Sequence, residues 1–125
     1  MSGLTLDSGA LIAFERNDRR VVAIMARALE HSLKLVVPSG VVGQCWRDGR
    51  RQARLARLLG SEVIEVVPLN DHLARASGQL CGVSRTNDVI DASVVVCARE
   101  RGHAVATSDA DDLRRLDPKL RLVVV

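Results

Sequence analysis

Aspartates stand at three separate places in this sequence where a short apolar run ends or a helix is expected to begin. Asp7 directly follows one apolar run, and Asp109 lies three residues beyond another. Asp88 and Asp91 are three residues apart, which puts them on neighbouring positions of one helical face. Gathered carboxylates repel and raise one another's pKa unless a cation neutralises them. Such oxygen ligands suit Mg²⁺ or Mn²⁺, and an ion with few protein ligands keeps positions open for phosphate oxygens and water.

Each of these aspartates also has an ordinary structural explanation. Asp88 and Asp91 would be favoured near a helix N-terminus by the helix dipole. Asp109 or Ser108 would serve as a helix N-cap, with the acids that follow as ordinary first-turn residues. Asp7 would bind backbone N–H groups in a tight turn. For any one of these aspartates, the structural explanation carries more weight than a functional one. Taken together, acids from three segments favour a binding site.

Short apolar runs alternate with longer amphipathic segments, and this pattern predicts the elements that would position the acids. We expect a helix to begin at Asn17 or Asp18, and Thr86 or Asn87 to cap the helix that ends at Gly102. The predicted strands are 4–6, 35–37, 63–67, 104–106 and 120–125, and the predicted helices are 8–15, 17–33, 39–59 with Gly49 as a kink, 70–81, 87–101 and 109–116.

Apolar strands that alternate with helices predict an α/β fold, with a mainly parallel central sheet of about five strands flanked by helices. The 125 residues suit a single domain. In parallel sheets, ligands bind beyond the carboxyl ends of the strands. The acids are therefore expected to meet at one edge of the sheet.

Composition narrows the classes of protein further. Hydrophobic residues make up 47% and charged residues 26%, as in soluble globular proteins, and no apolar run is long enough to cross a membrane. The N-terminus lacks the features of a signal peptide, so we expect a cytoplasmic protein. A net charge of +3 mildly favours a polyanionic partner. The three cysteines fit neither a disulfide framework nor a zinc site and are expected to be buried, and the three histidines are expected to be structural or exposed.

Three segments together resemble the PIN domain, and more narrowly the VapC-type toxin ribonucleases of bacterial toxin–antitoxin pairs. They are "LTLDSGALIAFER", "NDVIDASVVVCARERG" and "VATSDADDL", in the family's order, and the likeness extends over residues 1–125. The resemblance implies an α/β/α sandwich and a Mg²⁺- or Mn²⁺-dependent endoribonuclease that cleaves RNA. It also implies a homodimer and inhibition by a small VapB-like antitoxin.

The resemblance also implies roles for individual residues. The family's first, third and fourth acids match Asp7, Asp91 and Asp109. Asp88 and Asp112 lie where some members carry additional acids that help to bind metal or water. Ser8 and Thr107 are placed to orient the carboxylates through their hydroxyl groups.

One position departs from the family pattern. The second acid is usually a Glu, but Gln44 stands at that point. An amide carbonyl still binds a metal but brings no negative charge, so a second metal site should be weak or absent. Glu15 is the nearest substitute, and we interpret it as a structural or surface residue. The alternative hypothesis is therefore a catalytically weakened PIN domain that binds RNA or protein.

Arginines concentrate in the segment predicted as the helix 39–59. There they fall within about a third of the helix circumference, opposite a predicted core face of Val41, Val42, Cys45, Ala53, Ala56 and Leu59. The stripe has three possible explanations: a solvated face, a surface that follows RNA phosphates, or, together with Trp46, a docking site for a protein partner. Its members are Arg47, Arg50, Arg51, Arg54 and Arg57.

Overall fold

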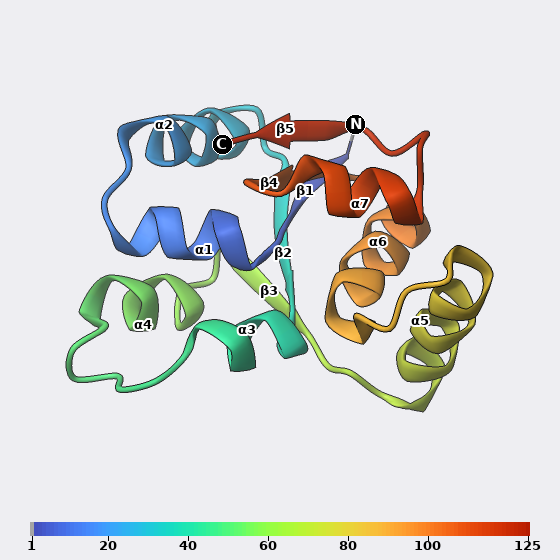
Figure 1. The fold of residues 1–125 in the computed structure, drawn as a ribbon. Coiled ribbons are helices and arrows are strands. Elements are labelled where there is room, and N and C mark those ends of the chain that lie inside the picture. Colours follow the sequence, from blue (N-terminus) through green and yellow to red (C-terminus); the bar gives the residue numbers. More distant parts are fainter. Residues whose placement is uncertain (1) are drawn as a thin grey trace.

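The computed structural model describes residues 2–125 and places five parallel strands in one sheet of order β3-β2-β1-β4-β5 (Figure 1). β1, the first strand of the chain, lies in the centre and pairs with β2 on one side and β4 on the other. The outer strands β3 and β5 pair with β2 and β4. The strands are β1 (Gly3–Leu6), β2 (Lys34–Pro38), β3 (Ile64–Val67), β4 (Ala104–Thr107) and β5 (Leu122–Val124).

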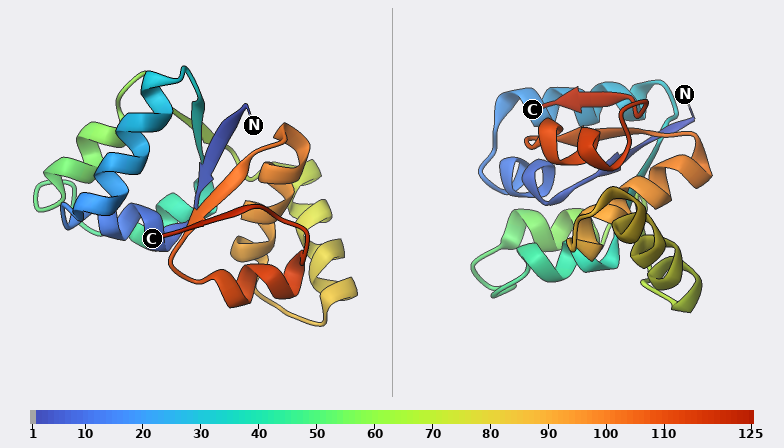
Figure 2. Two further views of the ribbon diagram at one scale, coloured as in Figure 1. Left: turned by 90° about the horizontal axis from the view of Figure 1, so that it is seen from above. Right: turned by 45° about the vertical axis from the view of Figure 1, so that its right-hand side comes forward.

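Helices cover both faces of this sheet. The helices α1, α2 and α4 lie on one side and α5, α6 and α7 on the other, as the view from above shows (Figure 2). α3 follows β2 and packs between α1 and α6. The predicted α/β/α sandwich is therefore confirmed. The helices are α1 (Ser8–Glu15), α2 (Arg19–Glu30), α3 (Ser39–Cys45), α4 (Ala53–Leu59), α5 (Asp71–Ser84), α6 (Val89–Arg101) and α7 (Ala110–Leu116).

The core lies where α6 crosses the middle of the sheet. α6 packs against β1, β2 and β4 on one side and against α5 and α7 on the other, so its residues 92–98 are all buried. This explains why the helix has no polar face in its middle. The rigid α6 fixes the position of its own first turn, which carries Asp91.

The prediction of one helix over 39–59 is wrong, because the loop 46–52 separates α3 from α4. Gln52 holds this loop: its Oε1 accepts from the backbone N of Arg47 at 2.7 Å and of Asp48 at 2.9 Å, and its Nε2 donates to the Cys45 carbonyl at 2.8 Å. Such side-chain bonds offer the backbone an alternative to helical hydrogen bonds.

The predicted core face also changes at this break. Val41 and Cys45 are buried in α3, as expected. In α4 the buried residues are Leu55 and Leu58, whereas Ala53 is exposed. The break resets the helical phase, so a face extrapolated from α3 does not continue into α4.

Several helix boundaries differ by a few residues. Asp18, not Asn17, caps α2, and α2 ends at Glu30 rather than at 33. α5 runs three residues beyond the predicted end, to Ser84. Asp88 caps α6, instead of Thr86 or Asn87. Each observed cap accepts hydrogen bonds from backbone N–H groups of the first turn, which is what selects it.

Other expectations concern single residue types and the membrane. All three cysteines are free and buried, as predicted. His103 is buried with its Nδ1 3.1 Å from Thr5 Oγ1, and His31 and His72 are exposed, so the structural or surface interpretation is confirmed. Across residues 2–125, no helix combines the length and apolar character that a membrane span requires.

Candidate metal centre

The candidate site lies at the carboxyl edge of the sheet, where β1 and β4 end side by side. β1 leads through α1 towards β2, and β4 leads through α7 towards β5 on the opposite side, so the strand order reverses between them. Such a reversal opens a crevice that commonly binds ligands. The Asp7 backbone N donates to the Ala106 carbonyl at 3.2 Å, which extends the β1–β4 ladder as far as Asp7.

Asp7 is buried and anchors the start of α1. Its Oδ1 accepts from the backbone N of Ala10 at 3.0 Å, so the predicted turn role is confirmed. Burial raises the pKa of Asp7, and hydrogen bonds from the Thr107 side chain and from the backbone of Ala10 and Gly9 partly offset that rise. Asp7 is therefore a carboxyl group whose charge a nearby cation would stabilise.

Asp88 and Asp91 lie at the start of α6. Asp88 is the N-cap, and its Oδ1 accepts from the backbone N of Asp91 at 2.9 Å. The pKa of Asp91 is raised to about 7, first by burial and then by the charges of Asp88, Asp112, Asp7 and Asp109. The structure thus brings together all five aspartates that the sequence singled out as metal ligands.

Asp109 and Asp112 complete this group from α7. Asp109 occupies the N-cap position of α7, but its side chain makes no capping bond to the helix. A hydrogen bond with Asp112 is the main reason that the pKa of Asp109 is raised, followed by burial and by the charges of Asp112, Asp7 and Asp111. Its carboxyl group therefore faces other acids rather than the helix end.

Small residues allow the segments that carry Asp7 and Asp109 to approach closely. A Cβ atom at Gly9 would overlap the Ser108 side chain, so only glycine fits between the start of α1 and the β4–α7 loop. Thr107 Oγ1 accepts from the backbone N of Asp109 at 2.8 Å and also hydrogen-bonds Asp7. Thr107 therefore contacts both segments, and its role in orienting the carboxylates stays a prediction.

A cleft of about 180 Å³ opens beside the acids, between the α5–α6 loop and α7. Asp88, Asp91 and Asp112 line it together with Arg115 and with Thr86, Asn87 and Leu116. The sequence reasoning overlooked Arg115, although it stands three residues after Asp112 on one helix. It also overlooked Thr86 and Asn87 as lining residues, because only the packing of the α5–α6 loop against α7 brings them here.

The chemistry of this donor set fits a hard divalent cation. All five candidate ligands are carboxylates, which suit Mg²⁺ or Mn²⁺. Within residues 2–125, no three side chains of His, Cys, Asp or Glu lie close enough together to hold a metal ion jointly. Mg²⁺ does not need such a cage, since it keeps several waters and is usually held by one or two carboxylates.

Ser8 and Gln44 are not linked to the acids by hydrogen bonds within the described chain. The Ser8 carbonyl accepts from Cys45 Sγ at 3.7 Å, which joins α1 to α3. Gln44 is exposed on α3, one turn beyond Gly40, which packs against Ile90 in the first turn of α6. Their roles at the centre stay predictions.

The five arginines do not form one helical stripe, so that prediction is wrong. Three lie in the loop 46–52 and two on α4, because the predicted helix is broken. Arg47 donates to the carbonyls of Gly43 and Trp46, and Arg54 donates to the Phe14 carbonyl and stacks 5.0 Å from the Phe14 ring. Arg51 pairs with Asp48 at 3.8 Å, so Arg50 and Arg57 are the better candidates for an external ligand, and that role stays a prediction.

A family model for the PIN domain matches residues 4–119. The chain belongs to the PIN domain family. The match extends from β1 through β4 and α7 and includes all five acids, whereas β5 lies beyond it. Comparison with curated protein sequences finds no match.

Solved structures share this PIN fold at low sequence identity. VapBC2 from Rickettsia felis, bound to a DNA fragment from its promoter, has a TM-score of 0.71 at 12% identity over 97% of both chains. FitAcB from Neisseria gonorrhoeae has a TM-score of 0.64 at 16% identity over 95% of both chains. VapC20 of Mycobacterium tuberculosis, a toxin that cleaves the sarcin–ricin loop, has a TM-score of 0.61 at 20% identity over 85% of this chain and 88% of its own chain.

Proposed function

We propose that this PIN domain is a Mg²⁺- or Mn²⁺-dependent endoribonuclease, and that it is the toxin of a VapBC-type toxin–antitoxin pair in the cytoplasm. The observation that supports this most strongly is the environment of Asp91. Four further aspartates, at the end of β1 and at the starts of α6 and α7, lie near enough to raise its pKa. Repulsion among these carboxylates does not stabilise the fold, so binding of a cation is the simplest explanation for their clustering.

The proposed chemistry is hydrolysis of an RNA phosphodiester bond. A bound Mg²⁺ or Mn²⁺ supplies a more acidic water and a counter-charge for the transition state. Asp7, Asp91 and Asp109 would supply the carboxylates that bind the ion, with Asp88 and Asp112 beside them, and water would fill most of its other positions. Thr107 fixes the orientation of Asp7, and burial of Asp7 excludes bulk water from one side of the site.

Metal-dependent cleavage of RNA by the purified chain tests this function. Cleavage should occur with added Mn²⁺ or Mg²⁺, stop with chelator, and be abolished by Asp91→Asn. Asp71→Asn is the matched control, because Asp71 is exposed on α5 and pairs with Arg75 at 3.0 Å, outside the acidic group. Equal cleavage by the wild type and Asp91→Asn would exclude Asp91 as a ligand.

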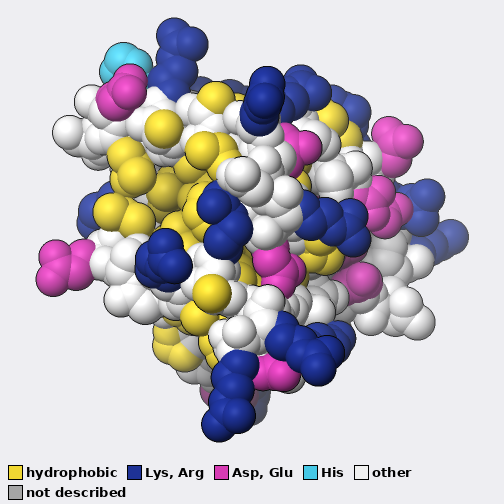
Figure 3. All heavy atoms as spheres, turned by 90° about the vertical axis from the view of Figure 1, so that its left-hand side faces the viewer, with side chains coloured by type: hydrophobic (Ala, Val, Ile, Leu, Met, Phe, Trp, Pro, Cys, Tyr) yellow, Lys and Arg dark blue, Asp and Glu magenta, His cyan; other side chains and the backbone are white. Residues whose placement is uncertain are grey.

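The proposed partners are an antitoxin and a second copy of the chain. Two of the similar structures, VapBC2 and FitAB, are complexes, and each is bound to a DNA fragment. The side formed by α1, α2 and α4 carries apolar areas among basic side chains (Figure 3), and one apolar groove there includes Ile24, Ala28 and Leu33. Sedimentation of the purified chain tests the homodimer. Toxicity on expression, relieved by a neighbouring gene, tests the antitoxin.

The second candidate function is a PIN domain with weakened catalysis that binds RNA or protein. Gln44 in place of an acid favours it, as does the lack of three enclosing ligands within residues 2–125. Such a module should retain RNA equally with chelator and with Mn²⁺ and should not cleave it.

A further inference from the structure

One of the residues that line the cleft beside the acids is positively charged, namely Arg115 of α7. Arg115 and Asp112 are three residues apart, so they face the cleft from the same side of the helix. Across residues 2–125, the Arg115 guanidinium takes part in no ion pair or hydrogen bond, although three carboxylates line the same cleft. The charge of Arg115 is therefore available to an external anion.

A second observation in the cleft also indicates a missing ligand. Thr86 Oγ1 is buried and has no hydrogen-bond partner among the described residues. A buried hydroxyl without a partner costs about 1–3 kcal/mol, so such groups usually have one. Thr86 lies on the wall opposite α7, and Asn87 beside it adds an amide donor. Thr86, Asn87 and Arg115 thus belong to the lining of the same cleft.

We propose, on the basis of the nuclease function proposed above, that Arg115 binds a phosphate of the RNA strand next to the phosphate that is cleaved. The Thr86 hydroxyl donates to the same segment of the strand. A guanidinium suits this task because its planar donors bind two phosphate oxygens at once. The carboxylates on the cleft wall would otherwise repel the strand. Arg115 is thus a substrate-positioning residue.

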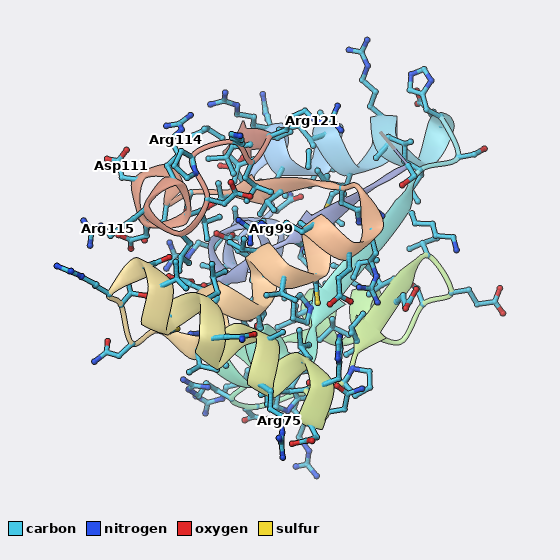
Figure 4. The ribbon with its side chains drawn as sticks, turned by 90° about the vertical axis from the view of Figure 1, so that its right-hand side faces the viewer. Arg75, Arg99, Asp111, Arg114, Arg115 and Arg121 are labelled. Atoms are coloured by element: carbon cyan, nitrogen blue, oxygen red, sulfur yellow. The ribbon has the colours of Figure 1, made fainter. Side chains whose placement is uncertain are left out.

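The neighbouring Arg114 provides a matched control. Both arginines are exposed on α7, but adjacent helical positions point about 100° apart. Figure 4 shows their side chains leaving the helix in different directions, and only Arg115 lines the cleft. Arg114→Ala removes the same charge from the same helix without changing the cleft.

The experiment measures binding of a labelled single-stranded RNA by fluorescence anisotropy over a series of salt concentrations. All variants carry Asp109→Asn, which removes a proposed metal ligand outside the cleft and so limits cleavage. Arg115→Ala should weaken binding about five- to tenfold and reduce the slope of log affinity against log salt by about 0.7, the value for one phosphate contact on a single strand. Arg114→Ala should leave the slope unchanged. Arg115→Lys should keep the parent slope but bind less tightly, since its ammonium is a point charge.

Equal slopes and affinities for Arg115→Ala and Arg114→Ala would overturn the proposal. So would a loss of antitoxin binding in Arg115→Ala without any change in RNA binding, because Arg115 would then serve a protein partner. Undetectable RNA binding by the Asp109→Asn parent would also overturn it. Cleavage by the otherwise unchanged chain is measured separately. If the chain does not cleave RNA but its RNA binding still depends on Arg115, the nuclease function is refuted and the RNA contact of Arg115 is not.

Thr86→Val gives an independent readout. Replacement of an unpaired buried hydroxyl by a methyl group of similar shape should leave the melting temperature unchanged or raise it. RNA binding should weaken about two- to threefold, because one neutral hydrogen bond is lost. Unchanged RNA binding in Thr86→Val would remove Thr86 from the proposed contact.

Discussion

Asp91→Asn should stabilise the metal-free protein at alkaline pH and leave it nearly unchanged at acidic pH. The folded protein raises the pKa of Asp91 from 3.8 to about 7. A group with a raised folded pKa contributes stability that is fully present below 3.8 and is lost as the pH rises through about 7. Asn carries no titratable proton, so the variant avoids this loss.

The magnitude follows from the size of the pKa shift. About three pKa units correspond to about 4 kcal/mol. Asp91 is partly exposed, and solvent screening reduces the expected effect to about 1–2 kcal/mol. For a chain of 125 residues, this corresponds to a rise in Tm of about 3–8 °C in the variant above about pH 8.

Thermal unfolding followed by circular dichroism, with chelator, measures this effect. The wild type and Asp91→Asn are compared at about pH 5 and pH 8, with Asp71→Asn as the control for loss of a surface charge. The Tm difference between Asp91→Asn and wild type should increase with pH, whereas that of Asp71→Asn should not. A difference that is the same at both pH values would show that the charged form of Asp91 is not destabilised by burial and by its neighbours. Added Mn²⁺ should then raise the Tm of the wild type more than that of the variant, since ligand binding stabilises the folded state.

Three further changes test other parts of the structure. Gln44→Glu should increase the rise in Tm caused by Mn²⁺, because negative ligands tighten divalent binding; equal rises across a full titration would remove Gln44 from the site. Gly9→Ala should lower the free energy of unfolding by about 1–3 kcal/mol through overlap with Ser108, measured by urea unfolding; a change below about 0.5 kcal/mol would show that the loop adapts. Gln52→Ala should speed amide hydrogen exchange in the loop 46–52, where its side chain makes three hydrogen bonds; unchanged exchange would show that the loop is held otherwise.

The sheet and most helices were predictable because their determinants are local. Buried strands appear in the sequence as short apolar runs, and Gly102, with φ of 68°, ends α6 because glycine readily adopts the left-handed conformation of a helix C-terminus. The convergence of Asp7, Asp91 and Asp109 also followed from one general rule on the carboxyl edges of parallel sheets. That rule needs only the correct order of strands and helices.

The failures concern features that depend on contacts between segments. The break in the helix 39–59 depends on how Gln52 reaches back to Cys45 and Arg47, and helical periodicity gives no indication of it. The arginine stripe failed for the same reason. The cleft that contains Arg115 exists only because the α5–α6 loop meets α7, and no spacing within either segment encodes that meeting.

The central position of β1 has a consequence for when the acidic centre forms during synthesis. β1 pairs with β4 through partners such as Leu6 and Ala106, so the contact order of this pairing is high. A ribosome adds roughly 5–20 residues per second, so β1 has to wait roughly 5–20 s for its second neighbour. Until then Asp7 lacks Thr107, and the β1–β4 crevice does not exist. We therefore expect the acidic centre to form only after nearly the whole domain has emerged, so the proposed nuclease would spare the RNA of the ribosome that makes it.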